Sequence, residues 1–289
     1  MASQASTRAP GPSHEPVWQA GRFVLSLRRT LLMGIVNVTP DSFSDGGRHD
    51  TPAAALAHAR RLIDEGADLL DLGAESTRPG SQPVSAPEEW RRLQPVLREL
   101  VGWQVPISVD TYHPETMRAA LELGVDIIND VYALRQPGAL EAVAASAEAG
   151  VCLMHMQGEP ASMQLEPHYD DVVAEVRAFL LQRAQAAKQA GVGRSRICLD
   201  PGFGFGKTRE HNLALARALE PLCEAGYPVL IGVSRKSMLA GTSKLPPLER
   251  VPASLGAALA CVAAGARVVR VHDVAATRDA LRTFEAMRP

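Results

Sequence analysis

The stretch LDPGFGFGKT, residues 199–208, places an aspartate, three glycines and a lysine within a few positions of one another. A phosphate-binding loop of the form G-x-x-x-x-G-K-[ST] would need a glycine five residues before Gly206, where the chain has Pro201. The dinucleotide-binding pattern G-x-G-x-x-G also fails, because the glycines stand at 202, 204 and 206. The stretch is therefore expected to serve a different ligand.

Polar side chains of the same chemical kinds end a whole series of apolar runs along the chain. These residues are Asn37, Glu75, Asp110, Asn129, Asp130, His155, Gln157, Asp200, the segment SRKS (234–237), Arg270 and His272, and Met154 accompanies His155. Buried polar groups cost free energy unless they are paired, so a purely structural protein has no need of so many. Together they indicate a binding site where the runs end.

The cationic members of this set predict a phosphate-bearing ligand. Arg78, Arg270, His272 and Lys236 carry or can carry positive charge, and arginine can bind two phosphate oxygens at once. Asn37 can add an oxygen ligand for Mg²⁺, which prefers oxygen donors and substrate phosphates.

The remaining polar residues predict a different part of the ligand. The carboxylates of Asp110 and Asp200 and the amide of Asn129 suit a flat ring with N–H donors and a carbonyl. We therefore expect a site with two halves, in which a heterocycle lies deep inside and phosphate lies near the mouth.

Each residue also has a plain structural interpretation. Asn37 can fix a turn, Asp110 and Asp130 can cap helices, and His155 between two methionines is expected to be a satisfied core histidine. Arg270 can pair with a nearby acid, as can His272. The convergence of the whole set favours a functional site.

The elements that must position these residues repeat along the chain. Short continuous apolar runs, typical of strands buried on both faces of a parallel sheet, alternate with helical patterns. Eight such units without a change in composition predict a single-domain α/β fold, the (β/α)8 TIM barrel, with a doubly wound open sheet as the alternative. The runs are residues 31–38, 68–75, 106–111, 126–131, 151–156, 197–202, 229–234 and 268–274.

Composition excludes several classes of protein. The 289 residues carry a net charge of −2, which favours neither nucleic acid nor an anionic membrane as a partner, and no apolar run has the 18 or so residues of a membrane span. The four cysteines form no C-x-x-C pair, which predicts reduced thiols and a cytoplasmic location. The Pro- and Ser-rich beginning predicts a disordered tail over residues 1–22 and a folded domain over residues 23–289.

Eight motifs, spread in order over residues 31–275, resemble those of the dihydropteroate synthase family. They are GIVNVTPDSFSDGG, GAESTRPGS, SVDT, INDV, CLMHMQG, DPGFGFGK, SRKS and RVHDV. The resemblance implies a (β/α)8 barrel that condenses 6-hydroxymethyl-7,8-dihydropterin pyrophosphate with 4-aminobenzoate to 7,8-dihydropteroate and pyrophosphate. It also implies Mg²⁺ as cofactor, sulfonamides as inhibitors and a homodimer.

The resemblance assigns roles by motif. It implies a pterin-binding set, a set for pyrophosphate and Mg²⁺, and an aminobenzoate pocket, with Lys236, Asp110, Asp200 and Phe43 closest to the chemistry. The pterin set is Asp110, Asn129, Asp200, Met154 and Lys236; the pyrophosphate and Mg²⁺ set is Asn37, Arg78, Arg270 and His272; the aminobenzoate pocket is Thr77, Arg78, Pro79, Phe205, Lys236 and Ser237, closed by Phe43.

Two other functions stay open at this point. One is a pterin-dependent methyltransferase on the same barrel, which would need no cationic rim. The other is a catalytically silent pterin-binding paralogue, which would be expected to lack Asn37, Arg78, Lys236 or His272, all of which are present. In the glycine stretch, Phe203 is expected to brace the loop from below, and Lys207 to face solvent or to pair locally.

Overall fold

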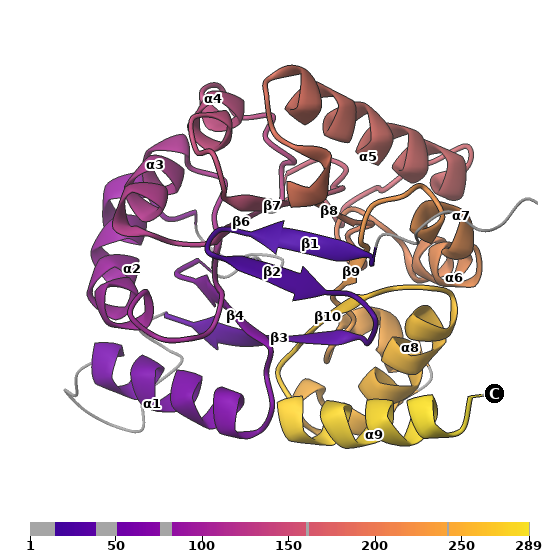
Figure 1. Ribbon diagram of the computed structural model, residues 1–289. Coiled ribbons are helices and arrows are strands. Elements are labelled where there is room, and N and C mark those ends of the chain that lie inside the picture. The colour runs from indigo at the N-terminus through magenta and orange to yellow at the C-terminus, as the bar shows by residue number, and fades with distance from the viewer. Residues whose placement is uncertain (1–14, 39–50, 76–82, 160–161, 242, 289) are drawn as a thin grey trace, which may run out of the picture.

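The computed structural model describes residues 15–38, 51–75, 83–159, 162–241 and 243–288. Eight parallel strands form one sheet in the order β8-β7-β6-β5-β4-β3-β10-β9, and helices surround it (Figure 1). The strands are β3 (Leu31–Asn37), β4 (Leu69–Gly73), β5 (Ile107–Asp110), β6 (Ile127–Asp130), β7 (Gly150–Met154), β8 (Ile197–Asp200), β9 (Leu230–Ile231) and β10 (Val268–Val271).

The two edge strands of this sheet meet and close it into a barrel. Leu199 on β8 forms a parallel bridge with Val229, and the Leu199 N–H donates to the carbonyl of Pro228 at 2.9 Å. The predicted TIM barrel is confirmed and the open sheet is excluded. Seven of the eight predicted runs contain a whole barrel strand, and the run 151–156 contains all of β7 except its first residue, Gly150.

Helices follow the strands and cover the outside of the barrel. They are α1 (Thr51–Asp64), α2 (Ala86–Leu100), α3 (Pro114–Leu123), α4 (Ala139–Ala144), α5 (Val172–Gln189), α6 (Arg209–Arg217), α7 (Glu220–Cys223), α8 (Val251–Ala263) and α9 (Val274–Ala286), with short 3-10 turns η2 (Arg194–Arg196), η3 (Ser237–Gly241) and η4 (Pro247–Glu249). Local chemistry sets several ends. Asp171 caps α5 by accepting from the N–H groups of Val173 and Ala174, and α3 stops at Gly124 in the left-handed conformation.

A β-hairpin precedes the barrel and corrects the predicted tail. Strands β1 (Val17–Ala20) and β2 (Phe23–Ser26) pair antiparallel and lie across the end of the barrel that faces the viewer in Figure 1. Trp18 is fully buried there, and its indole N–H donates to the carbonyl of Arg196 at 3.0 Å. Residues 17–22 therefore belong to the fold, because the barrel end offers apolar surface that buries one face of β1.

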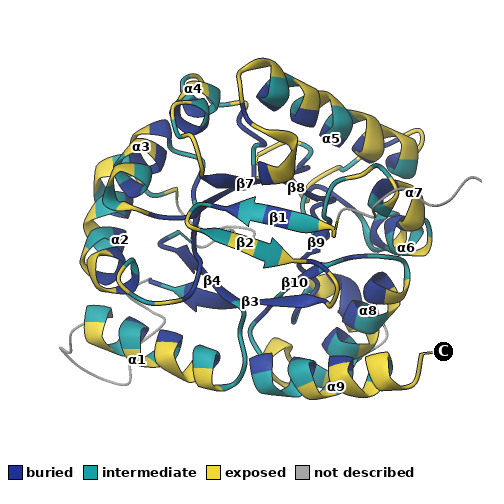
Figure 2. Ribbon diagram, in the orientation of Figure 1, coloured by how far each residue is buried: buried dark blue, intermediate teal, exposed yellow. Residues whose placement is uncertain are grey.

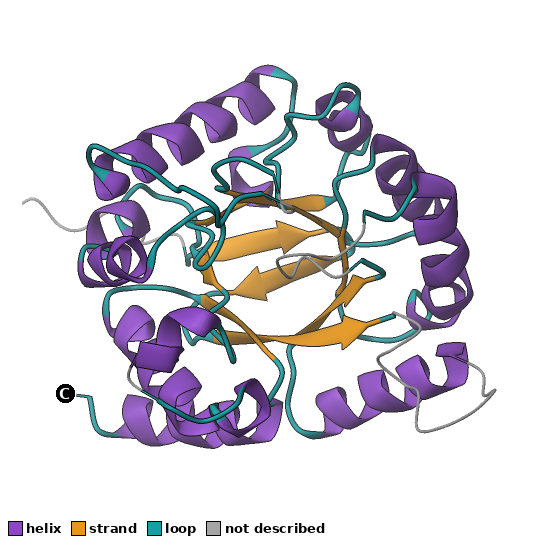
Figure 3. Ribbon diagram, turned by 180° about the vertical axis from the view of Figure 1, so that it is seen from behind, coloured by secondary structure: helices purple, strands orange, loops and turns teal. Residues whose placement is uncertain are grey.

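Burial follows the layers of the barrel. The barrel strands are buried almost throughout, whereas the helices bury only their inner faces (Figure 2). One apolar cluster joins the helices to the strands. A second joins Trp18 to the barrel interior at the hairpin end through Met33, Leu69 and Ile127. Loops that follow the strands gather at the opposite end of the barrel, the end facing the viewer in Figure 3. Among the described residues, no helix is long and apolar enough to cross a membrane.

Candidate active site

An arginine from the last strand crosses to the second and third barrel strands. Arg270 on β10 donates from Nε to Asp71 at 2.6 Å and from its terminal nitrogen to Asp110 at 2.9 Å. β10, β3, β4 and β5 are consecutive in the sheet, so this network spans four strands. The two predicted halves of the site therefore meet at Arg270, which the resemblance had grouped with the phosphate set.

Asp71 is a residue of this network that the sequence analysis missed. It is fully buried in the middle of β4, where it also accepts from Ser108 Oγ at 2.6 Å and Asn129 Nδ2 at 3.2 Å. The carboxylate thus fixes both Arg270 and Asn129. An aspartate inside the otherwise apolar run DLLDLG was the available signal, because a carboxylate there requires partners.

The charges of this network depend on one another. Burial raises the pKa of Asp110 to about 7, against the attraction of Arg270. Burial also opposes the charged form of Arg270, but Asp71 and Asp110 outweigh it and hold the pKa of the guanidinium above its ordinary value. The guanidinium therefore stays charged at neutral pH, whereas Asp110 can be either protonated or ionised there.

Asp200 ends β8 and begins the glycine stretch. Its carboxylate is buried and accepts from the Gly202 N–H at 2.7 Å; burial raises its pKa, and Lys236 opposes the shift. Gly202 has a positive φ of 65°, and a Cβ there would lie 1.9 Å from the carbonyl oxygen of His155. The loop therefore requires glycine because the backbone of His155, immediately after β7, approaches it so closely.

Lys207 holds this loop from inside the protein. It is 2% exposed, and its ammonium lies 3.0 Å from Nδ1 of His155 and 2.9 Å from each of the carbonyl oxygens of Gly202 and Phe205. Burial lowers the pKa of Lys207 to about 7, with Asp200 opposing. Local pairing is thus confirmed, and exposure to solvent was the wrong alternative. His155 is the satisfied core histidine that was predicted.

Lys236, which follows β9, approaches the same loop from another side. Its ammonium donates to the carbonyl of Phe203 and lies 4.5 Å from the centre of the Phe205 ring. Burial lowers the pKa of Lys236 to about 8, with Asp200 opposing. Phe203 is fully buried beneath the loop, as predicted, whereas Phe205 is only partly buried.

The segment SRKS divides between structural and site residues. Ser234 Oγ lies 2.9 Å from Nδ1 of His272, which orients that ring. Arg235 instead pairs with Asp273 at 2.5 Å. Ser237 begins η3 and is exposed.

The remaining expected residues divide into three groups. Met154 is buried beside Phe205 in a small apolar cluster, and Asn37 ends β3 next to Gly73 of β4. Asp130 accepts from the N–H groups of Tyr132 and Leu134, so it stabilises a turn. Four expected residues lie outside the described part of the chain: Phe43, Thr77, Arg78 and Pro79.

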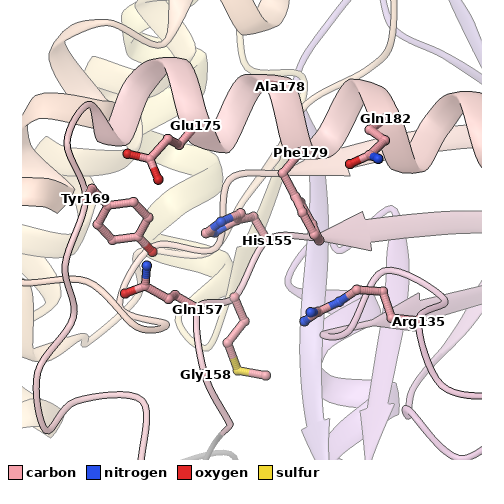
Figure 4. A pocket seen from close by; sticks show the side chains of 10 residues that line it. Arg135, His155, Gln157, Gly158, Tyr169, Glu175, Ala178, Phe179 and Gln182 are labelled. Carbon is pink, nitrogen blue, oxygen red and sulfur yellow. The ribbon is translucent and has the colours of Figure 1, made fainter.

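A hollow of about 710 Å³ lies beside this cluster rather than over it. It is lined by the end of β7 and by α5, with His155, Gln157, Tyr169 and Phe179 among its side chains (Figure 4). None of the charged residues at the ends of β4, β5, β8 and β10 lines it. The chemistry is therefore assigned from the converging side chains and not from this hollow.

The family described as pterin binding enzymes matches residues 33–272 of the chain. The dihydropteroate synthase of Neisseria meningitidis serogroup C is 56% identical over 275 residues, which cover 94% of this chain and 97% of that protein. The chain belongs to the dihydropteroate synthases. This membership excludes the methyltransferase alternative.

Solved structures of dihydropteroate synthases agree with this membership. The Xanthomonas albilineans enzyme with 4-aminobenzoic acid is 52% identical, with a TM-score of 0.90 over 96% of this chain and 100% of that one. The Yersinia pestis enzyme in a sulfonamide complex is 43% identical, with a TM-score of 0.89 over 94% and 99% of the two chains. The whole barrel is therefore shared.

Proposed function

We propose that the cluster at the carboxyl ends of β4, β5, β6, β8 and β10 is where this dihydropteroate synthase condenses its two substrates. The observation that carries the proposal is the set of buried Asn129 and Asp200 and partly buried Asp110 beside the cations Arg270 and Lys236. In TIM-barrel enzymes the catalytic residues lie at this end of the strands.

The buried acids and amide fit the dihydropterin ring. A carboxylate can accept from the ring's amino group and an adjacent N–H together, while the Asn129 side chain can pair with a carbonyl and an N–H. Asp71 holds Asn129 and Arg270 and thereby positions them. The ring would then lie against Met154, with Lys236 at its edge.

The cations fit the pyrophosphate group. Arg270, His272 and Lys236 would bind its oxygens, and Ser234 would keep the His272 ring in place. Asn37 offers an amide oxygen at the end of β3, which suits Mg²⁺ bound jointly by one protein group and by substrate phosphates. When bound there, Mg²⁺ would supply charge neutralisation of the leaving group.

The reaction breaks the bond between the pterin CH₂ and the pyrophosphate oxygen, and forms a bond from that CH₂ to the amine of 4-aminobenzoate. The amine loses one proton, and pyrophosphate leaves with the bonding electron pair. The amine is a weak nucleophile, so we propose that the C–O bond breaks first. The carboxylates of Asp110 and Asp200 would then stabilise the positive charge that the pterin ring delocalises.

The second substrate is assigned to the surface around the glycine loop. Phe205 and Lys236 would contact the benzoate ring, and Ser237 would bind its carboxylate. The resemblance adds Thr77, Arg78, Pro79 and Phe43, which lie outside the described residues. A sulfonamide presents a similar aniline ring, so we expect it to inhibit competitively with 4-aminobenzoate.

We also propose a homodimer that acts in the cytoplasm. Helix α8 exposes small residues at Pro252, Gly256 and Ala260, and a groove of about 460 Å³ between α8 and α9 is lined by Leu259, Phe284 and Met287. Such a face suits close packing of a second copy, which light scattering would detect as a doubled mass.

The four free cysteines agree with a reducing compartment such as the cytoplasm.

Release of pyrophosphate tests the proposed reaction. We expect stoichiometric pyrophosphate only when the pterin pyrophosphate, 4-aminobenzoate and Mg²⁺ are all present. Full turnover in excess EDTA would contradict the Mg²⁺ assignment. Binding of the pterin without turnover would instead identify a silent paralogue.

A further inference from the structure

A second group of ionisable side chains lies beside the site, at the ends of β4 and β5. Glu75 follows β4, Glu89 lies in the first turn of α2, and His113 immediately precedes α3. Each offers one nitrogen or oxygen atom, and these atoms all lie within 4.8 Å of one another. The three side chains meet because β4 and β5 are adjacent in the sheet and α2 connects them.

One oxygen in this group is buried without a partner. Glu89 is 1% exposed; its Oε2 accepts from Thr111 Oγ1 at 2.7 Å, whereas Oε1 has no hydrogen-bond partner in the described structure. The hydroxyl of Thr116 opposes the rise in the pKa of Glu89 that burial causes. This hydroxyl also forms no hydrogen bond of good geometry. A buried carboxylate oxygen in this state is costly and indicates that a proton or a ligand completes it.

The other two side chains are already oriented by the backbone and by a tyrosine. Nε2 of His113 lies 2.9 Å from the carbonyl oxygen of Val84, which can only accept, so Nε2 carries the proton and Nδ1 keeps the lone pair. Glu75 accepts from the Val84 N–H at 3.1 Å and from the Tyr112 hydroxyl. Outer contacts of this type fix the tautomer and direction of residues that bind metal ions.

We propose that Glu75, Glu89 and His113 form a binding site for a divalent transition-metal ion of the zinc class. One imidazole and two carboxylates suit Zn²⁺, whereas Mg²⁺ and Ca²⁺ prefer oxygen ligands alone. Ligand bonds of about 2.1 Å in a tetrahedral site require ligand atoms roughly 3.4 Å apart. The three ligand atoms lie within 4.8 Å of one another, so binding of an ion would draw them closer together.

This site is separate from the one proposed for Mg²⁺ at Asn37 and has a different consequence. A bound ion would tie the end of β4 to the beginnings of α2 and α3. Its ligand His113 lies three residues after Asp110 on the chain. It would also neutralise the carboxylates that crowd this junction. The expected result is a brace that stabilises the barrel beside the active site without taking part in the reaction.

The test uses the full, untagged chain after treatment with a chelator. Equilibrium dialysis is expected to show one equivalent of Zn²⁺ bound, and Co²⁺ is expected to give the visible absorption of a four-coordinate site with nitrogen and oxygen ligands. The thermal midpoint should rise with Zn²⁺ and be unchanged by Mg²⁺ at equal concentration. Absence of stoichiometric uptake by the wild-type chain would overturn the proposal and assign a proton to Glu89.

Substitutions locate the ion. Glu89→Gln and His113→Asn should each weaken Zn²⁺ binding at least tenfold and abolish the Co²⁺ absorption, with circular dichroism verifying that the variants fold. The matched controls are Glu88→Gln, the neighbouring glutamate on α2, and His168→Asn, an exposed histidine; both should bind as the wild type does. Equal affinity in the wild type and in His113→Asn would place the ion elsewhere and refute the site.

Discussion

The two ends of the barrel use the same strands for opposite purposes. At the end covered by the hairpin, Trp18, Met33 and Ile127 pack in an apolar cluster in which all three side chains are fully buried. Toward the other end, the equally buried strands carry the polar residues Asp71, Asn129 and Asp200.

This difference separates stability from chemistry. Burial of apolar surface at the hairpin end lowers the free energy of the folded state. The carboxylates at the other end lose their hydration on folding, and the ion pairs with Arg270 and the hydrogen bonds from backbone N–H groups offset only part of that free energy. Substitutions at the hairpin end should therefore reduce mainly stability, whereas substitutions at the other end should reduce mainly substrate binding and activity.

The largest expected effect is on stability, from Trp18→Ala at the hairpin end. Loss of a fully buried indole and of its hydrogen bond to Arg196 should lower the free energy of unfolding by about 3–5 kcal/mol. Urea unfolding measures this, with Val24→Ala on the exposed side of the same hairpin as the control. The folded fraction should keep its kcat/KM, and a selective loss of catalysis would contradict the division.

Lys207→Met tests a residue that links the two roles. Removing the ammonium leaves the carbonyls of Gly202 and Phe205 without that donor, which should cost about 2–4 kcal/mol of stability. Because this loop presents Asp200 and Phe205, KM should rise as well. Denaturant unfolding and steady-state kinetics measure both effects, with Lys188→Met on α5 as the control. If KM is unchanged, Lys207 does not position the loop for substrate.

Asp110→Asn and Asp200→Asn should damage binding more than folding. Each removes an anionic acceptor proposed for the pterin, which corresponds to a loss of affinity of about 1.5–3 kcal/mol. Calorimetry with the pterin pyrophosphate measures this, and Asp170→Asn, an exposed aspartate, is the control. A residue whose substitution leaves affinity unchanged has no place in the pterin site.

The smallest expected effect is a pH dependence of stability in the absence of ligand. The pKa of Asp110 is raised to about 7 from an ordinary value of 3.8, so the folded state binds its proton more readily than the unfolded state does. Its stabilising contribution is complete below pH 4 and is lost as the pH rises to 7. The wild type should lose about 1–2 kcal/mol relative to Asp110→Asn between pH 6 and pH 8. A pH-independent difference would show that Asp110 stays ionised.

The amino-acid sequence by itself determined the architecture and most strand-end residues. Apolar runs separated by helical patterns predicted all eight barrel strands, because burial on both faces leaves a local record in the chain. The position of Asp110 and Asp200 at strand ends followed from that pattern. The family motifs then implied the reaction, and membership in the dihydropteroate synthases confirms it.

Only the tertiary structure decided how distant residues pair. Arg270 and Asp71 are 199 residues apart and meet because the barrel brings β10 and β4 to either side of β3. Lys207 reads as a surface lysine in a polar loop, yet the close approach of β7 and β8 buries it against His155. Trp18 looked like part of a tail because the surface that buries it forms only when the barrel closes. Local patterns record burial, whereas partners across the barrel depend on closure of the whole chain.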